Sequence, residues 1–269
     1  IILGNLYQTE KSWRVYGCCI RRYAGAQRRL KVMGGGRSVI ALKDIQANPT
    51  FQTLIRRTNE YLSVLGYTEH GLRHVTYVST MTAYILETLG YDQRTIELGS
   101  IAGYLHDIGN MHNRKYHGPT GANIVYFELR RLGMPLEEIC EITTSIANHE
   151  EEIGVPVNPI CAALVIADKS DAHRTRVGRK SRGDIHDRVN HAITDSSLVV
   201  DSGNSTITLE LAFDTSECQI MDYFTIYLTR MEMCQQAAAL LRCTFRLVIN
   251  GLELIGESTS CAGLRPASG

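Results

Sequence analysis

The sequence predicts a mainly α-helical protein that ends in a small α+β part. Two patterns support this fold class. Apolar residues recur three and four positions apart between about residues 44 and 192, whereas apolar and polar residues alternate after residue 195. With 269 residues, 44% of them hydrophobic and 21% charged, the chain has ample apolar material for a core. We expect a basic flexible leader over residues 1–43, a helical domain over residues 44–195 and an α+β part over residues 196–269.

The leader is expected to be flexible because of its composition. Residues 1–37 carry eight Lys and Arg side chains against one acid, Glu10, and they include three consecutive glycines at 34–36. Such an Arg-rich and acid-poor segment also has the composition of a transit peptide, and Met33 would serve equally well as a start for the residues that follow. We assign no catalytic role to this segment.

The helical domain is expected to contain a series of helices that are bounded by Gly, Pro or Asp. Asp92 is a suitable N-cap, Pro119 suits a first helical turn, and Gly90 and Gly133 follow the ends of two helices. The expected ranges are residues 70–89, 92–109, 119–133, 135–151 and 158–173.

The pattern changes to that of strands near residue 197. Residues 197–201 and 205–213 flank the sequence Ser-Gly-Asn and predict a hairpin. A long helix is expected over residues 215–241. A second hairpin is expected from residues 245–249 and 252–255, which flank the turn pair Asn250-Gly251.

Composition excludes several classes of function. Lys plus Arg and Asp plus Glu each number 28, so bulk charge does not favour nucleic acid as a partner. The sequence contains no apolar run near the roughly 18 to 20 residues that span a bilayer, so we expect no membrane association. The eight cysteines include no C-x-x-C pair, which favours reduced thiols and a cytoplasmic location.

The chemically distinctive feature is a concentration of histidines, because six of the nine lie between residues 70 and 149. Histidines and aspartates fall near the ends of five successive expected helices, where a bundle can direct them into one pocket. Neutral imidazole and carboxylate are ligands of divalent Fe, Mn, Ni, Co and Zn, and a carboxylate shared at Asp107 would allow two ions to bind roughly 3.5 to 4 Å apart. The candidate ligands are His74, His106, Asp107, His117, His149 and Asp168.

These segments resemble the HD-domain superfamily of metal-dependent phosphohydrolases. Residues 103–110, Gly-Tyr-Leu-His-Asp-Ile-Gly-Asn, are similar to its HD signature, residues 69–75 to its first-His helix, and residues 167–169 to its final Asp. The extra His117 and His149 resemble ligands of the two-metal branch, which includes the HD-GYP cyclic-di-GMP phosphodiesterases. The Gly-Tyr-Pro element of that group is replaced here by Gly-Val-Pro at residues 154–156.

The resemblance implies two divalent transition-metal ions and hydrolysis of a phosphomonoester or phosphodiester, nucleotide-like substrates included. Asp107 and Lys169 are the expected catalytic residues. We expect His70, Lys169, Arg174 and Arg176 to bind an anionic phosphorylated small molecule, with His70 one helical turn before His74 and the arginines in a basic flap. Two other functions use the same residues: a di-iron oxygenase of the HD-related type and a non-catalytic HD signalling module. A homodimer is also considered.

Overall fold

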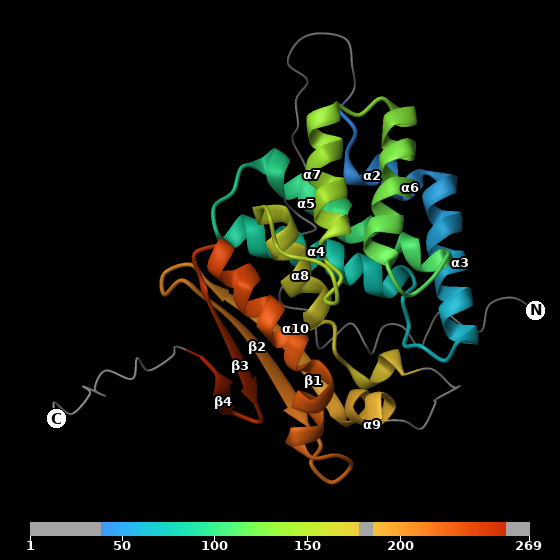
Figure 1. Cartoon of the computed structure of the whole chain (residues 1–269). Helices are drawn as coiled ribbons and strands as arrows, with labels where there is room; N and C mark the ends of the chain where they lie inside the picture. Colours follow the sequence, from blue (N-terminus) through green and yellow to red (C-terminus); the bar gives the residue numbers. More distant parts are fainter. Residues whose placement is uncertain (1–38, 178–184, 257–269) are drawn as a thin grey trace, which may run out of the picture. The chain divides into compact units, whose positions relative to one another are not determined.

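The computed structural model describes residues 39–177 and 185–256 (Figure 1). These residues belong to one compact unit. The mainly α fold class is confirmed, since a helical bundle is followed by a small sheet. Residues 1–38 of the expected leader and residues 178–184 of the expected basic flap lie outside the described residues. The division into domains at residue 195 remains a prediction.

The bundle follows the expected order with shifted ends. Asp92 is the N-cap of α5 and accepts hydrogen bonds from the backbone N–H groups of Arg94 and Thr95. Pro119 lies in the first turn of α6, as expected, and the helix begins two residues earlier at His117. The described helices of this part are α2 (Leu42–Ala47), α3 (Pro49–Val64), α4 (Leu72–Thr88), α5 (Gln93–Leu105), α6 (His117–Leu132), α7 (Leu136–Ala147) and α8 (Pro159–Ser170), with short 3-10 turns at Ile108–Met111 and Arg174–Arg176.

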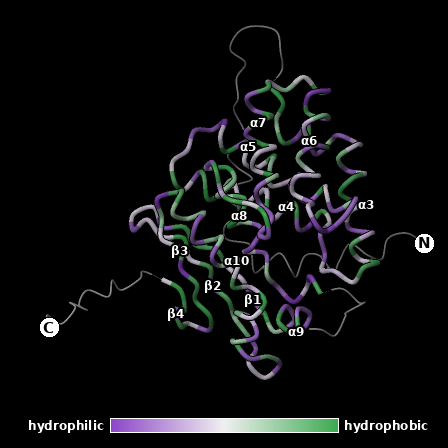
Figure 2. The backbone as a smooth tube through the Cα atoms, in the orientation of Figure 1, coloured by the Kyte–Doolittle hydropathy of each residue, from purple (hydrophilic) through white to green (hydrophobic). Residues whose placement is uncertain are grey.

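Helix α8 is the centre of the bundle. All residues from Ile160 to Ala167 are buried, so this helix is apolar on every side (Figure 2). It contacts α4, α5 and α7, and on another side it contacts α10 (Ile220–Leu240). The end of α8 therefore lies where the bundle meets the C-terminal part.

The C-terminal part is a four-stranded sheet in the order β1-β2-β3-β4 (Figure 1). Both expected hairpins are present as antiparallel pairs, the first between β1 (Ile193–Asp201) and β2 (Thr206–Phe213), the second between β3 (Thr244–Ile249) and β4 (Leu252–Ile255). Strands β2 and β3 pair in parallel, so α10 is the crossover between them, and it packs on β3, β2 and α8. A short helix, α9 (Ile185–Ala192), precedes β1.

None of the helices in the described ranges 39–177 and 185–256 has the length and apolar character required to cross a membrane.

Candidate metal centre

All six candidate ligands converge at one end of the bundle. His74 belongs to α4, His106 is the C-cap of α5 and is followed by Asp107, His117 opens α6, His149 follows α7, and Asp168 belongs to α8. All are buried except Asp168, whose side chain is 18% exposed.

Glycine allows the close packing that brings the helices together. A Cβ built on Gly109 would lie 1.9 Å from the carbonyl oxygen of His117, and a Cβ on Gly103 would lie 2.8 Å from the Cα of Ser79. The turn after Asp107 thus rests directly on the first turn of α6. The same contact sets the distance between Asp107 and His117.

The first half of the cluster contains His74, His106 and Asp168. The Nε2 atoms of the two histidines lie 3.3 Å apart, and Asp168 Oδ1 lies 3.4 Å from the first and 3.6 Å from the second. Asp107 Oδ2 lies 3.5 Å from each of the same two nitrogens. Four potential ligand atoms therefore surround one point.

The second half contains His117 and His149, whose Nε2 atoms lie 3.1 Å apart. Asp107 Oδ1 lies 3.6 Å from the first and 4.0 Å from the second. The two oxygens of Asp107 therefore face two different histidine pairs.

The hydrogen bonds of the four rings determine which nitrogen carries the proton. In three rings, Nδ1 contacts a backbone carbonyl oxygen, at 2.9 Å in His106, 2.8 Å in His117 and 2.6 Å in His149. In the fourth ring, His74, Nδ1 contacts Asp171 Oδ2 at 2.7 Å. Because these oxygens only accept, Nδ1 donates, and Nε2 of a neutral ring presents a lone pair. Burial lowers the pKa of His149 to about 3, which keeps that ring neutral.

This arrangement fits metal ions better than hydrogen bonds. When the four rings are neutral, two lone pairs face each other at 3.3 Å in one pair and at 3.1 Å in the other, and two acceptors cannot form a hydrogen bond. In addition, the buried Asp107 Oδ2 has no hydrogen-bond partner among the described residues. Divalent cations satisfy lone pairs of this kind, and the geometry yields two candidate groups, His74 with His106 and Asp168, and His106 with Asp107 and His149.

Other buried charges fix the ligands. Asp171 accepts a hydrogen bond from His74 Nδ1. It also accepts two hydrogen bonds from the guanidinium group of Arg73, at 2.8 and 3.1 Å. Glu150 accepts from the backbone N–H groups of Tyr116 and Gly118 and lies 3.3 Å from His117 Nδ1. Burial disfavours the charge of Glu150, but these donors lower its pKa to about 2.

Lys169 supports Asp168 and does not line the pocket. Its ammonium group lies 2.7 Å from Asp168 Oδ2, 3.0 Å from the carbonyl oxygen of His149 and 3.0 Å from Glu151 Oε2. These three acceptors match its three N–H donors, and its side chain is only 3% exposed. Lys169 thereby leaves Asp168 Oδ1 directed at the histidines.

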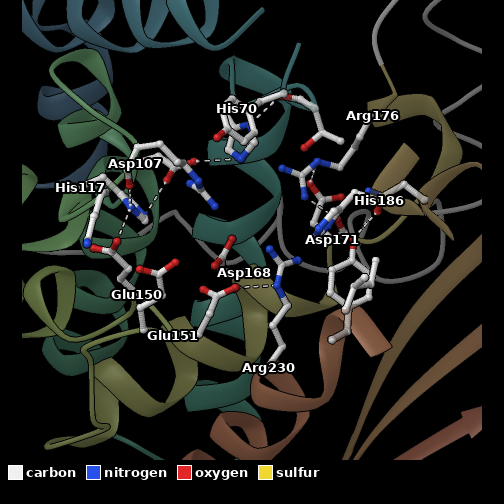
Figure 3. Close-up of a pocket in the computed structure, with 18 of the residues that line it drawn as sticks. His70, Asp107, His117, Glu150, Glu151, Asp168, Asp171, Arg176, His186 and Arg230 are labelled. Carbon is white, nitrogen blue, oxygen red and sulfur yellow. Dashed lines mark hydrogen bonds and ion pairs between the residues drawn. The ribbon is translucent and has the colours of Figure 1, made fainter. Parts of the chain in front are cut away.

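A cavity of about 690 Å³ opens next to the cluster (Figure 3). Asp107, His117 and Asp168 line it on the side of the bundle. Its other walls come from the segment before α4, from the residues around Arg176, and from α9 and α10, which contribute His186, Asn190, Tyr227 and Arg230.

Only some of the expected substrate-binding residues line the cavity. His70 and Arg176 line the cavity, whereas Arg174 does not and lies 4.0 Å from Asp214. The expectation that His70 lies on the helix of His74 is wrong, because Gly71 is the N-cap of α4 and His70 precedes it. His70 Nδ1 instead contacts the carbonyl oxygen of Thr68 at 2.6 Å, which directs Nε2 toward Asp107 Oδ2, 4.0 Å away.

Sequence reasoning missed two residues of this site, Asp171 and Arg230. Asp171 is the C-cap of α8 and has the appearance of a solvated helix end in the sequence. Only the position of Asp171 one helical turn after Asp168 gives a weak signal. Arg230 carries no signal in the sequence, because α10 is brought to the pocket by tertiary packing alone.

Comparisons with known proteins point to one family. Residues 71–175, which are less than half of the chain, match the HD domain family. Among solved structures, the chain is similar to a predicted HD superfamily hydrolase from an uncultured Thermotogales bacterium, with 20% identity over 50% of this chain and 75% of that one and a TM-score of 0.39. No curated protein matches the chain. The matched region includes all six candidate ligands but ends before α9 and α10.

Proposed function

We propose that the protein is a metal-dependent phosphohydrolase that cleaves a phosphomonoester or phosphodiester with water at a two-metal centre. The observation that carries this proposal is the position of Asp107, whose two oxygens face two separate pairs of histidine lone pairs. In the proposed assignment, His74, His106 and Asp168 would hold one ion, His117 and His149 would hold the other, and Asp107 would serve both. The donor set suits Fe, Mn, Ni, Co or Zn.

When bound, two such ions supply an acidified water as nucleophile and positive charge for the phosphoryl oxygens. The chain's own residues hold the ligands and shape the pocket. Asp171, Glu150 and Lys169 fix the orientations of His74, His117 and Asp168, and we assign Lys169 a positioning role. His70 Nε2 offers a lone pair in the cavity, so it can accept a hydrogen bond from water or from a substrate hydroxyl.

The charge of the cavity supports a requirement for metal. Its described lining holds seven carboxylates, at Asp107, Glu150, Glu151, Glu152, Asp168, Asp171 and Asp187, and four basic side chains, at Arg114, Lys115, Arg176 and Arg230. A phosphate ester would be repelled by this lining unless divalent cations offset the carboxylates. A volume of about 690 Å³ lies in the range of small-molecule sites and accommodates an ester of nucleotide size.

The test is to quantify bound metal in the purified protein and then to assay nucleotides, cyclic dinucleotides and simple phosphomonoesters with Mn, Fe, Ni and Co. We expect two ions per chain and phosphate release that is lost on chelation and restored by metal. Oxygen uptake without phosphate release would instead favour the di-iron oxygenase, and metal-free protein that binds none of these ions would favour the non-catalytic module. A cytoplasmic location and a homodimer remain predictions.

A further inference from the structure

Arg230 is a basic residue that reaches the metal-side cavity from outside the HD domain. It lies on α10, in the C-terminal part, and lines the same cavity as Asp107, His117 and Asp168 (Figure 3). Its side chain is 32% exposed, so the guanidinium group is accessible from the cavity.

Two contacts hold Arg230 in a defined orientation. Its Nε donates to Glu151 Oε1 at 2.6 Å, and its guanidinium carbon lies 4.5 Å from the centre of the Tyr227 ring. Tyr227 is itself fixed, since its hydroxyl donates to Asn190 at 2.8 Å. The anchored atom is Nε, and the two terminal nitrogens form no hydrogen bond with any residue in the described ranges.

The anchor of Arg230 is connected to a candidate metal ligand. Glu151 pairs with Arg230 through one oxygen and with Lys169 through the other, and Lys169 holds Asp168. This chain of charges connects the guanidinium group to Asp168. Burial acts against the charge of Arg230, but the nearby carboxylates, Glu151 first, raise its pKa, so it stays protonated at all accessible pH values.

The other basic side chains of the cavity are less available to an anion. All three guanidinium nitrogens of Arg176 donate to the backbone oxygens of Glu69 and Asp171. Arg114 donates to Asn110, which in turn donates to Asp107. Lys115 is exposed and lies over the ring of Tyr116. Among the basic side chains in the described part of the cavity lining, Arg230 is therefore the one whose anchoring leaves both terminal nitrogens available toward the cavity.

We propose that Arg230 binds the phosphoryl group of the substrate through its two terminal nitrogens, so that α10 completes the site of the HD domain. This inference rests on the proposed phosphohydrolase function. A guanidinium group with two parallel N–H donors matches two oxygens of a phosphate, which a lysine cannot reproduce. Tyr227 and Asn190 also line this cavity, whose volume of about 690 Å³ has room for the organic part of the ester.

The experiment measures binding of inorganic phosphate to the metal-loaded full chain by calorimetry, with metal content measured in parallel. Arg230→Gln should keep the metal content of the wild type and weaken phosphate binding about 10- to 100-fold, because two charge-assisted hydrogen bonds are lost. Arg230→Lys should recover only part of this loss, since it restores the charge without the fork. Arg130→Gln, which removes a charge from an exposed position on α6 outside the cavity, is the matched control and should bind phosphate as the wild type does.

Each outcome decides a different point. Wild-type phosphate affinity in Arg230→Gln would overturn the inference alone, and so would loss of metal from that variant, because Arg230 would then serve the metal centre and not the anion. Full affinity in Arg230→Lys would overturn the two-point contact. If the metal-loaded wild type binds no phosphate and releases none from any ester, both the inference and the proposed function fail.

Discussion

Asp171 is the charged acceptor that orients His74, and replacing it tests whether the centre contains two separable ions. Its Oδ2 accepts from His74 Nδ1 at 2.7 Å and from Arg73 at 2.8 Å, while Oδ1 accepts from Arg73 at 3.1 Å. In Asp171→Asn, one of these positions becomes an NH2 group. If the NH2 group takes the place of Oδ1, it faces an N–H donor of Arg73. If it takes the place of Oδ2, it faces N–H donors of both Arg73 and His74.

The expected effect is confined to one half of the centre. Loss of a carboxylate that supports a ligating histidine typically lowers metal affinity about 10- to 100-fold, or about 1.4 to 2.7 kcal/mol. Asp171→Asn should weaken the ion held by His74, His106 and Asp168 by this factor. Glu150→Gln should weaken the ion at His117 instead, because Glu150 lies 3.3 Å from its Nδ1.

The assay is a calorimetric titration of Mn²⁺ into chelator-stripped protein. Wild type should show two binding steps, and each variant should shift a different one. Glu152→Gln is the control, since Glu152 also lines the cavity but has no described contact with the six candidate ligands. The reasoning would be refuted if Asp171→Asn and Glu150→Gln weakened the same binding step. It would also be refuted if neither variant weakened a binding step more than Glu152→Gln does.

Three further changes follow from the same structure. Asp107→Ala should abolish bound metal and phosphate release together, as measured by elemental analysis and product assay, with unchanged helical circular dichroism; retained turnover would remove the hypothesis. Gly109→Ala, whose Cβ would overlap the backbone of α6, should lower the free energy of unfolding by about 1 to 3 kcal/mol or more in urea titrations, whereas Gly203→Ala, with its nearest atom at 3.3 Å, should stay near wild type. Asp92→Ala should cost about 1 kcal/mol at neutral pH. Hydrogen bonds from Thr95 and the backbone lower the pKa of Asp92. Its contribution to the free energy of unfolding is therefore present above about pH 4 and is lost as the pH falls through the lowered pKa. The prediction would be contradicted if urea titrations at pH 2 still showed the same difference in stability between wild type and Asp92→Ala.

The candidate ligands could be predicted because their residue types are rare and chemically restrictive. Histidine at 74, 106, 117 and 149 has few uses on otherwise apolar helix ends, and the resemblance at residues 103–110 supplied the order in which they combine. The supporting charges could not be found in this way. Asp171 is an ordinary acid at a helix end in the sequence, and Glu150 is one of three consecutive glutamates that could each support the site. Only the fold shows that their partners are His74 and His117.

Errors in the sequence interpretation came from local rules that tertiary contacts override. The helical period runs through His70, but Glu69 Oε1 accepts the backbone N–H of Gly71 and Asn59 accepts that of His70, so the helix starts two residues later. The assignment of Arg174 and Arg176 to substrate binding remains a prediction. Arg176 lines the cavity, although its donors are largely used by backbone oxygens, and Arg174 lies 4.0 Å from Asp214.

The substrate side of the pocket depends on topology that no local period encodes. Hairpin signals predict β1 with β2 and β3 with β4, but they do not state how the two hairpins join. Because β2 and β3 pair in parallel, the connection between them must cross over, and α10 is long enough to pack on the sheet and on α8 at the same time. Helix α8 carries Asp168, so the crossover brings Arg230 to the side of the candidate ligands. The candidate ligands thus lie in the region that matches the HD domain family, whereas the wall that faces them is set by the pairing of two distant strands.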